Sequence, residues 1–176
     1  DRALVFGGTT NGYTGLNDTW ALNLNGHHAD WKLLEPSIGI PNPRLVHTAI
    51  FDDKRNRMVV YGGATGTSFW DGVWEMRASR QDARWTPLQP DGESPGPRDL
   101  HTAIYDEERD RMVVFGGFTY PSTYYSDTWF LQWDRGRRDH DDDDGGNVIV
   151  RRGEQPLSTG ANAAPLALGL TRVHPN

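Results

Sequence analysis

The feature that most constrains this chain is an internal repeat of about 54 residues. Internal repeats of this length indicate repeat architectures and have to be sought before any local structure is predicted. The recurring residues are a pair of glycines (Gly7, Gly8; Gly62, Gly63; Gly116, Gly117), a first tryptophan (Trp20, Trp74, Trp129), a second tryptophan (Trp31, Trp85), an arginine (Arg44, Arg98) and a histidine (His47, His101). Because the markers keep their order and nearly their spacing, each repeat is one structural unit.

The middle repeat contains four predicted strands. The runs 47–51, 57–61, 71–76 and 84–88 carry β-branched and aromatic residues, and charged or glycine- and proline-containing turns separate them. Four short antiparallel strands in about 50 residues, repeated along a chain, are typical of the blades of a β-propeller.

The recurring residues have physical roles in such a blade. Paired glycines allow positive φ and close backbone approach. Each tryptophan can bury a large apolar ring between blades, and its N–H then needs an acceptor. We expect the arginine and the histidine to hydrogen-bond carbonyl or carboxylate groups near the start of a strand. Since all of them recur in register, we interpret them as structural residues.

In this order, the Gly-Gly pair, the Asp-Thr-Trp segment, the second tryptophan and the Pro-Arg-x-x-His segment resemble the kelch repeat, over about residues 1–135. The stretches 53–58 and 107–112 resemble the connection between the first two strands in long blades of bacterial kelch proteins. The resemblance implies an all-β, kelch-type β-propeller of the galactose-oxidase-like central-domain type. It does not imply the oxidase activity, which depends on a cysteine-linked tyrosine, because this chain has no cysteine.

The repeat divides the chain into five segments. We expect a partial blade over 1–43 (strands 2–4), a complete blade over 44–97, a partial blade over 98–135 (strands 1–3), an acidic and polar linker over 136–165, and the possible start of a C-terminal Ig-like sorting domain over 166–176. The first three segments make about 2.5 blades of an incomplete ring, followed by a flexible tail.

An incomplete ring leaves the outer faces of its first and last blades without a neighbour, which is an aggregation hazard. We therefore expect the chain to be the C-terminal part of a longer propeller whose remaining blades are its partners. Assembly of several copies into a ring is the less favoured alternative.

The tail allows two interpretations of its acidic run at 139–144. A metal or calcium site is one, and a solvated linker is the favoured one, because crowded like charges repel each other. The segment 166–176 resembles the opening of the sorting domain found on many secreted bacterial proteins. That resemblance implies an extracellular or cell-surface location.

Composition excludes several classes of function. The net charge of −6 provides no basic field for nucleic acid. No apolar run approaches the ~20 residues of a membrane span. No metal site, cofactor motif or catalytic set stands out in the sequence, and the strand-one residues expected near the central channel are Thr48, Ala49, Thr102 and Ala103.

One face of the predicted disc has the composition of a recognition surface. Strands alternate in direction, so the loops between strands two and three gather at one end. These loops carry aromatic residues among small polar ones, as binding surfaces do. We call this end the aromatic loop face, and its candidate binding residues are Tyr13, Phe69, Trp70, Tyr120, Tyr124 and Tyr125. The alternative is that these rings fold over the blades and contribute to packing.

The sequence therefore predicts a non-catalytic binding or scaffold module that recognises a protein or a glycan through the aromatic loop face. Two alternatives stay open. One is part of a propeller enzyme (a hydrolase, lyase or isomerase) whose channel residues lie in other blades, and the other is a structural spacer of a cell-surface protein.

Overall fold

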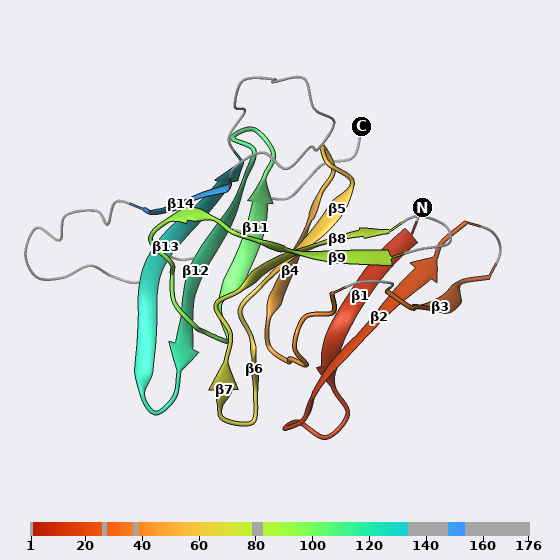
Figure 1. Ribbon diagram of the computed structural model, residues 1–176, viewed down its shortest axis with the longest axis horizontal. Helices are drawn as coiled ribbons and strands as arrows, with labels where there is room; N and C mark the ends of the chain where they lie inside the picture. Colours follow the sequence, from red (N-terminus) through yellow and green to blue (C-terminus); the bar gives the residue numbers. More distant parts are fainter. Residues whose placement is uncertain (1, 26–27, 37–38, 79–82, 134–147, 154–176) are drawn as a thin grey trace, which may run out of the picture.

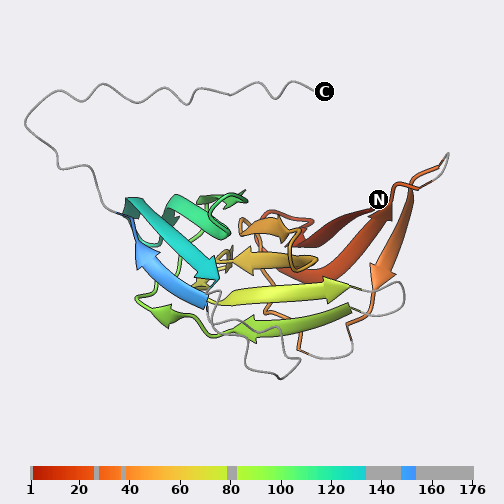
Figure 2. The ribbon, with the colours of Figure 1, turned by 90° about the horizontal axis from the view of Figure 1, so that it is seen from above.

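The computed structural model describes residues 2–25, 28–36, 39–78, 83–133 and 148–153. All regular secondary structure in these residues is β-strand, and the strands form three twisted sheets that lie side by side, together with a two-stranded hairpin (Figures 1 and 2). Each of the three larger sheets is one blade. Together with the predicted repeat, this arrangement confirms an all-β propeller architecture with an open ring.

Blade 1 consists of β1 (Arg2–Thr9), β2 (Gly15–Asn23) and β3 (Asp30–Leu34). Blade 2 consists of β4 (Thr48–Asp52), β5 (Arg57–Tyr61), β8 (Val73–Ala78) and β9 (Ala83–Leu88). Blade 3 consists of β11 (Thr102–Asp106), β12 (Arg111–Thr119), β13 (Thr123–Trp133) and β14 (Val148–Arg152). The loop between β5 and β8 contains the hairpin of β6 (Ala64–Thr65) and β7 (Ser68–Phe69), and β10 (Asp91–Gly92) precedes blade 3.

The strand β14 corrects one expectation. The repeat predicts that blade 3 ends at 135 and that 136–165 is a linker, because no second tryptophan appears where the repeat requires one. In the structure, β14 pairs antiparallel with β13 as the fourth strand, and Val150 opposite Leu131 takes the place that Trp85 opposite Met76 has in blade 2. A valine-rich run can fill an outer strand without the marker residue. The remaining predicted tail, including 139–144 and 166–176, lies outside the described residues.

The glycine pairs work as predicted. All six glycines have φ between 61° and 110°, and a β-bulge interrupts the strand register at the pairs of blades 1 and 3. A side chain at Gly62 would place its Cβ 2.6 Å from the carbonyl oxygen of Arg98, so the next blade's connection approaches too closely for any other residue.

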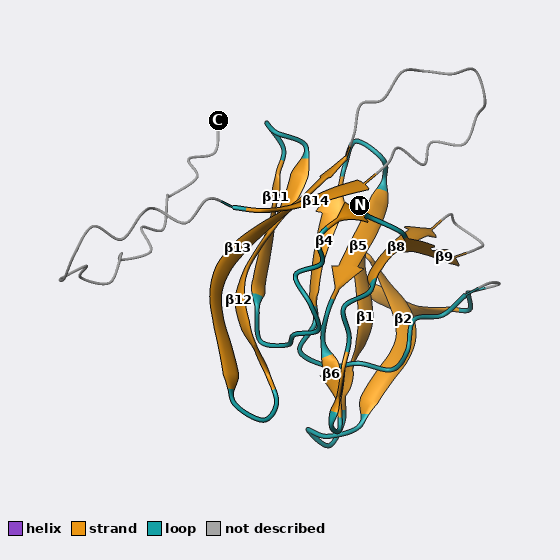
Figure 3. Ribbon diagram, turned by 60° about the vertical axis from the view of Figure 1, so that its left-hand side comes forward, coloured by secondary structure: helices purple, strands orange, loops and turns teal. Residues whose placement is uncertain are grey.

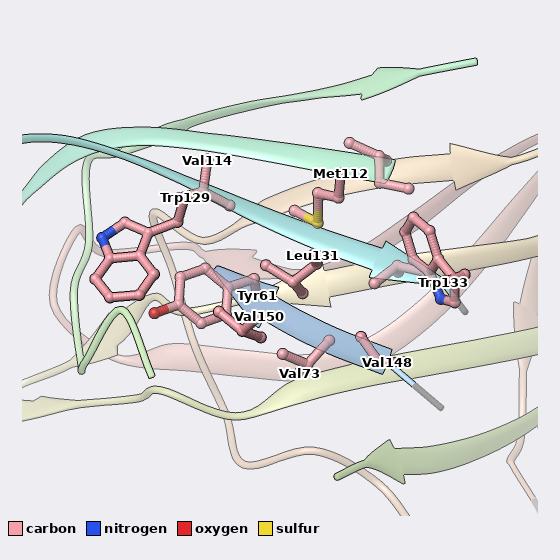
Figure 4. Close-up of a cluster of buried hydrophobic side chains, with 11 residues drawn as sticks. Tyr61, Val73, Met112, Val114, Trp129, Leu131, Trp133, Val148 and Val150 are labelled. Carbon is pink, nitrogen blue, oxygen red and sulfur yellow. The ribbon is translucent and has the colours of Figure 1, made fainter. Parts of the chain in front are cut away.

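The apolar core lies between the blades. Blade 2 presents Met58, Val60, Met76 and Trp85 to blade 1, where they pack around Phe6. Its other face presents Val59, Tyr61 and Val73 to blade 3, where they meet residues that include Met112, Val114, Trp129, Leu131 and Trp133 (Figure 4). Alternate side chains of the same strands thus point to opposite neighbours, and blade 2 is covered on both faces.

Blades 1 and 3 each keep one face exposed. Ile104 and Phe115 of blade 3 align with the buried Ile50 and Tyr61 of blade 2, yet they are 63% and 51% exposed. On blade 1, Trp31 aligns with the buried Trp85 and is 57% exposed. These faces have the composition of blade interfaces and no neighbour within the described residues.

The connections between blades lie against the outer strands. β10 pairs in parallel with β14, with Asp91 opposite Ile149 and Gly92 opposite Val150. Pro36, in the preceding connection, makes a parallel bridge to Ala83 of β9. Each connection therefore covers an outer edge that would otherwise expose unpaired backbone groups.

Candidate functional site

The loops between the second and third strands of all three blades gather at one end of the structure, at the bottom of Figure 1 and again in Figure 3. They are the turn between β1 and β2, the β6–β7 hairpin and the tip of the β12–β13 hairpin. This is the end that the alternation of strands predicts for the aromatic loop face. Its binding role stays a prediction.

Three of the six candidate residues are largely exposed. Tyr13, Tyr120 and Tyr124 are 80%, 65% and 81% exposed. The backbone around Tyr13 is fixed: Asn11 Oδ1 accepts hydrogen bonds from the N–H groups of Tyr13 (3.0 Å) and Thr14 (2.8 Å). The N–H of Gly66 in the β6–β7 hairpin donates to the carbonyl of Tyr13 at 3.2 Å, which joins the loops of two blades.

A ring cluster connects the loops of blades 2 and 3. The ring centroid of Phe118 lies 6.3 Å from that of Phe69 and 4.9 Å from that of Tyr124. Phe118 was not among the candidates, although its place directly after the third glycine pair could have identified it. Phe69 of blade 2 thus contacts Phe118 of the neighbouring blade 3, and Tyr124 packs against Phe118 within blade 3.

Trp70 and Tyr125 are half-buried and lie against two buried arginines. The Arg98 Cζ atom is 4.1 Å from the centroid of the Tyr125 ring, and the Arg44 Cζ atom is 6.0 Å from that of Trp70. These two rings therefore follow the alternative prediction, in which the aromatic rings fold over the blades and contribute to packing.

The recurring arginines bind backbone carbonyls, as predicted. Arg44 Nη1 donates to the carbonyl of Gly62 and Arg98 Nη1 to that of Gly116, both at 2.9 Å. Arg98 also forms an ion pair with Asp127, whose Oδ1 is 2.7 Å from Nη1. Burial opposes ionisation of Asp127, but hydrogen bonds from Arg98 and Trp129 outweigh it and lower the pKa of that carboxyl group. Burial alone lowers the pKa of Arg44 to about 10.

The recurring histidines differ from the prediction. His101 Nε2 lies 2.7 Å from the hydroxyl of Thr48, and the described residues offer no acceptor or donor to the buried Nδ1 of either His47 or His101. Both imidazoles instead pack against aromatic rings, 5.5 Å from Phe6 and 5.2 Å from Tyr61. Burial, with a smaller contribution from the nearby arginine, lowers the pKa of each histidine to about 4.

Three of the five recurring tryptophans donate their indole N–H to a side chain, as predicted. Trp20 Nε1 donates to Asp18 at 2.6 Å, Trp129 Nε1 to Asp127 at 2.7 Å and Trp85 Nε1 to Thr19 at 3.1 Å. Trp74, the equivalent of Trp20 and Trp129, has no such acid two residues before it, since Gly72 stands there.

The opposite end of the blades carries a network of buried ion pairs. Arg57 bridges Asp52 (2.9 Å) and Glu75, while Arg55 of blade 2 binds both oxygens of Asp110 in blade 3 at 2.9 and 3.0 Å. The Arg55 hydrogen bond is the largest cause that lowers the pKa of Asp110 to about 2. Tyr105 donates to the Asp110 carboxylate at 2.7 Å. Arg57 Nη2 is buried with no partner among the described residues, whereas the Arg55–Asp110 contacts join blade 2 to blade 3.

Thr48 of the innermost strand is engaged by His101. No group of His, Cys, Asp and Glu suited to a metal ion occurs among the described residues. A cavity of about 590 Å³ lies between β1 and β4, lined by residues that include Leu4, Ile50 and Met58. Nor do the described residues include a helix that could cross a membrane.

The three sheets, the glycine bulges and the blade-to-blade cores define the fold as that of a kelch-like β-propeller. No family model matches the chain. The solved structure of YjhT, a kelch-type propeller, superposes with a TM-score of 0.61 at 15% identity, over 86% of this chain and 42% of that one.

Curated proteins that match the chain include kelch-repeat proteins of the host cell factor group. The host cell factor homologue hcf-1 of Caenorhabditis elegans is 33% identical over an aligned length of 132 residues, and the match covers 66% of this chain and 16% of that protein. Human host cell factor 2 is 31% identical over 110 residues, 58% of this chain and 13% of that protein. The flagellar outer-arm dynein alpha chain of Chlamydomonas reinhardtii is 30% identical over 138 residues, 76% of this chain and 3% of that protein. The chain thus spans a small part of these relatives.

Proposed function

We propose that this chain is a non-catalytic protein-interaction module that binds its partner on the aromatic loop face. The observation that carries the proposal is the exposure of Tyr13, Tyr120 and Tyr124 on loops at one end of the three blades. Exposed tyrosines contribute little to folding, whereas in an interface each supplies a large rigid ring and a hydroxyl at low entropic cost.

The support of these loops suits binding. The Tyr124 ring packs against the ring of Phe118, and a backbone hydrogen bond from Gly66 joins the Tyr13 turn to the β6–β7 hairpin. Side chains that are held in place before binding lose less conformational freedom when a partner arrives. A central aromatic cluster surrounded by polar loop residues is the usual composition of an energetic hot spot.

The relatives favour a protein over a glycan as the partner. Their names include a chain of the flagellar outer dynein arm and a subunit of the dynein regulatory complex, which are parts of protein assemblies. A glycan partner is the alternative, and a glycan array tests it with the same variants.

The test compares binding of the chain with that of a Tyr13→Ala/Tyr124→Ala double variant. Proteins captured from a lysate are identified by mass spectrometry, and each one is then purified and titrated directly. We expect at least a tenfold loss of affinity in the variant, with an unchanged melting temperature, because both side chains are exposed. Phe51→Ala removes a ring that is 42% exposed on the innermost strand of blade 2, outside the aromatic loop face, and serves as the control. Equal affinity of the wild type and the double variant would refute the proposal.

Export to the cell surface or the extracellular space is a second element of the proposal. It rests only on the resemblance of 166–176 to the opening of a secreted sorting domain. Surface labelling of cells that express the native protein tests it, and exclusive recovery of the protein from the cytosol contradicts it.

A further inference from the structure

Blade 3 holds a carboxylate at a defined place. The Asp127 side chain receives Arg98 Nη1 at 2.7 Å on Oδ1, and it receives Arg98 Nη2 at 3.4 Å and Trp129 Nε1 at 2.7 Å on Oδ2. One carboxylate thus serves an arginine fork and an indole N–H, and the guanidinium group is completely buried. Charge-assisted hydrogen bonds of this kind are the strong ones in proteins.

Blade 2 repeats the surroundings of that carboxylate. The carbonyl of Arg44 accepts from Gly8 N at 2.9 Å, as that of Arg98 accepts from Gly63 N at 2.8 Å. Trp74 stands opposite Val60 in the sheet, as Trp129 stands opposite Val114. Because Nη1 of each arginine also donates to the equivalent glycine carbonyl at the same distance, the two guanidinium groups occupy equivalent positions.

The acid itself is replaced in blade 2. Gly72 occupies the position of Asp127, and a Cβ atom built there would meet only atoms of Trp74, the nearest being Nε1 at 3.1 Å. The direction toward Trp74 is the one that the Asp127 carboxylate takes toward Trp129. Gly72 and Trp74 are half-buried, so the place between them and Arg44 reaches the surface.

Three donors around this place have no protein acceptor among the described residues. Within the described residues, the hydrogen bonds of the Arg44 side chain use Nε and Nη1 only, and Trp74 Nε1 makes none. Trp70, whose ring centroid lies 6.0 Å from Arg44 Cζ, has a buried Nε1 to which the described part of the chain offers no acceptor.

The charges nearby do not neutralise Arg44. His47 beside it is neutral at pH 7, because burial and the charge of Arg44 lower its pKa to about 4. Asp71 is exposed and forms no ion pair with Arg44 in the described structure. A buried cation without a counter-charge has a high desolvation cost. An anion that reaches Arg44 would therefore gain a strong electrostatic interaction that the fold itself does not supply.

We propose that blade 2 binds a carboxylate group between Arg44 and Trp74 Nε1, in the position that the Asp127 carboxylate occupies in blade 3. The source is an Asp or Glu side chain of the protein that docks on the aromatic loop face, to which Trp70 belongs. This assignment of the source rests on the proposed function, whereas the site itself does not.

Indole N–H signals in ¹H–¹⁵N NMR spectra of the 176-residue chain test the site, with acetate as the probe. Acetate is titrated at constant ionic strength against chloride, and Trp74→Phe assigns the signal. We expect a saturable shift of the Trp74 signal. The signals of Trp20 and Trp129 are internal controls, because both N–H groups already donate to aspartates. A Trp74 signal that does not move, or moves equally with chloride, overturns the proposal.

Substitutions at Gly72 make the test independent of the arginine. Gly72→Asp supplies the carboxylate within the chain, so it is expected to shift the Trp74 signal without acetate and to abolish the response to it. Gly72→Ala adds only a Cβ and is the matched control, which keeps the response. A full acetate response in Gly72→Asp contradicts the proposed position.

Arg44→Lys tests the arginine itself. It keeps the charge but loses the guanidinium fork, and we expect the affinity for acetate to fall about tenfold or more.

Capped amino acids distinguish the source of the carboxylate. N-acetyl-glutamate methylamide is expected to shift the Trp74 signal, and the glutamine analogue is expected not to. If acetate binds and the capped glutamate does not, the site takes a small carboxylate instead and the assignment to a protein side chain is wrong. Loss of partner binding on Tyr13→Ala/Tyr124→Ala with no acetate response refutes this inference alone, and the reverse pattern refutes the proposed function alone.

Discussion

Arg44 and Arg98 occupy equivalent positions in blades 2 and 3, and both guanidinium groups are enclosed by protein. Arg98 has the carboxylate of Asp127 beside it, whereas Arg44 has only the carbonyls of Asn42 and Gly62 as acceptors within the described residues. Blade 1 has the complementary arrangement: Asp18 accepts a hydrogen bond from Trp20, and its second oxygen is buried with no partner among the described residues.

The comparison separates the contacts that every blade needs in order to fold from the one group that differs between blades. The carbonyl contacts that fix the arginine to the glycine pair are kept in both blades, so they are what the fold requires. The carboxylate is present in blade 3 and absent from blade 2, so a blade can form without it. A repeat that keeps its scaffold and varies one group acquires a distinct local chemistry at that group.

The largest expected effect comes from removing the acid of blade 3. Asp127→Asn leaves Arg98 buried without an anion, which is expected to reduce the free energy of unfolding by about 3–5 kcal/mol. Urea denaturation measures it. Asp18→Asn is the control, because Asp18 pairs with an indole and with no arginine in the described residues, and it is expected to cost about 1 kcal/mol. Equal losses in the two variants would show that the arginine has no special need of the acid.

Acid sensitivity extends the comparison to the histidines beside the two arginines. His47 and His101 have a pKa of about 4 in the folded protein and about 6.5 when unfolded. The stability that they contribute is complete above pH 6.5 and is lost as the pH falls toward 4. Between pH 7 and pH 5 the loss is on the order of 2 kcal/mol for each ring. Urea melts of His47→Gln and His101→Gln at both pH values are each expected to lose half of this dependence, and an unchanged dependence contradicts the assignment.

Adding the missing acid to blade 2 should remove the contrast. Gly72→Asp is expected to raise the free energy of unfolding by about 1–2 kcal/mol relative to Gly72→Ala, because a charged hydrogen-bond acceptor then faces Arg44. Using the alanine variant as the reference cancels the backbone contribution of replacing glycine. Thermal melts of the two variants side by side measure the difference, and no gain for aspartate would mean that Arg44 is already satisfied.

The smallest expected effect concerns the opposite end of the blades. Arg55 reaches Asp110 of the next blade with two hydrogen bonds, whereas its equivalent Arg109 is 61% exposed and contacts only acids of its own turn. Arg55→Lys is expected to cost about 1 kcal/mol and Arg109→Lys less than about 0.5 kcal/mol. Denaturant melts compare the two, and a larger loss at Arg109 would contradict the role of this pair in joining blades.

The repeat predicts the blades, the glycine bulges, the arginine–carbonyl contacts and the end of the disc at which the aromatic loops gather. These depend on spacing, which a sequence records directly. It did not predict β14, because an outer strand needs apolar residues but no marker. The ion pair of Arg98 with Asp127 spans 29 residues, and only the folded chain brings the two together. Gly72 is visible in the sequence as a departure from Asp-Thr-Trp, but its consequence depends on which arginine stands opposite.

The pairing of β10 with β14 bears on how the blades unfold. β10 belongs to the connection that leaves blade 2, yet its partner is the last strand of blade 3. Detaching that outer strand therefore disturbs the exit from the preceding blade, so neighbouring blades are coupled through the backbone as well as through side chains. In a linear array, strong coupling between neighbours makes the units melt together rather than one by one. The three blades are accordingly expected to behave as one cooperative unit.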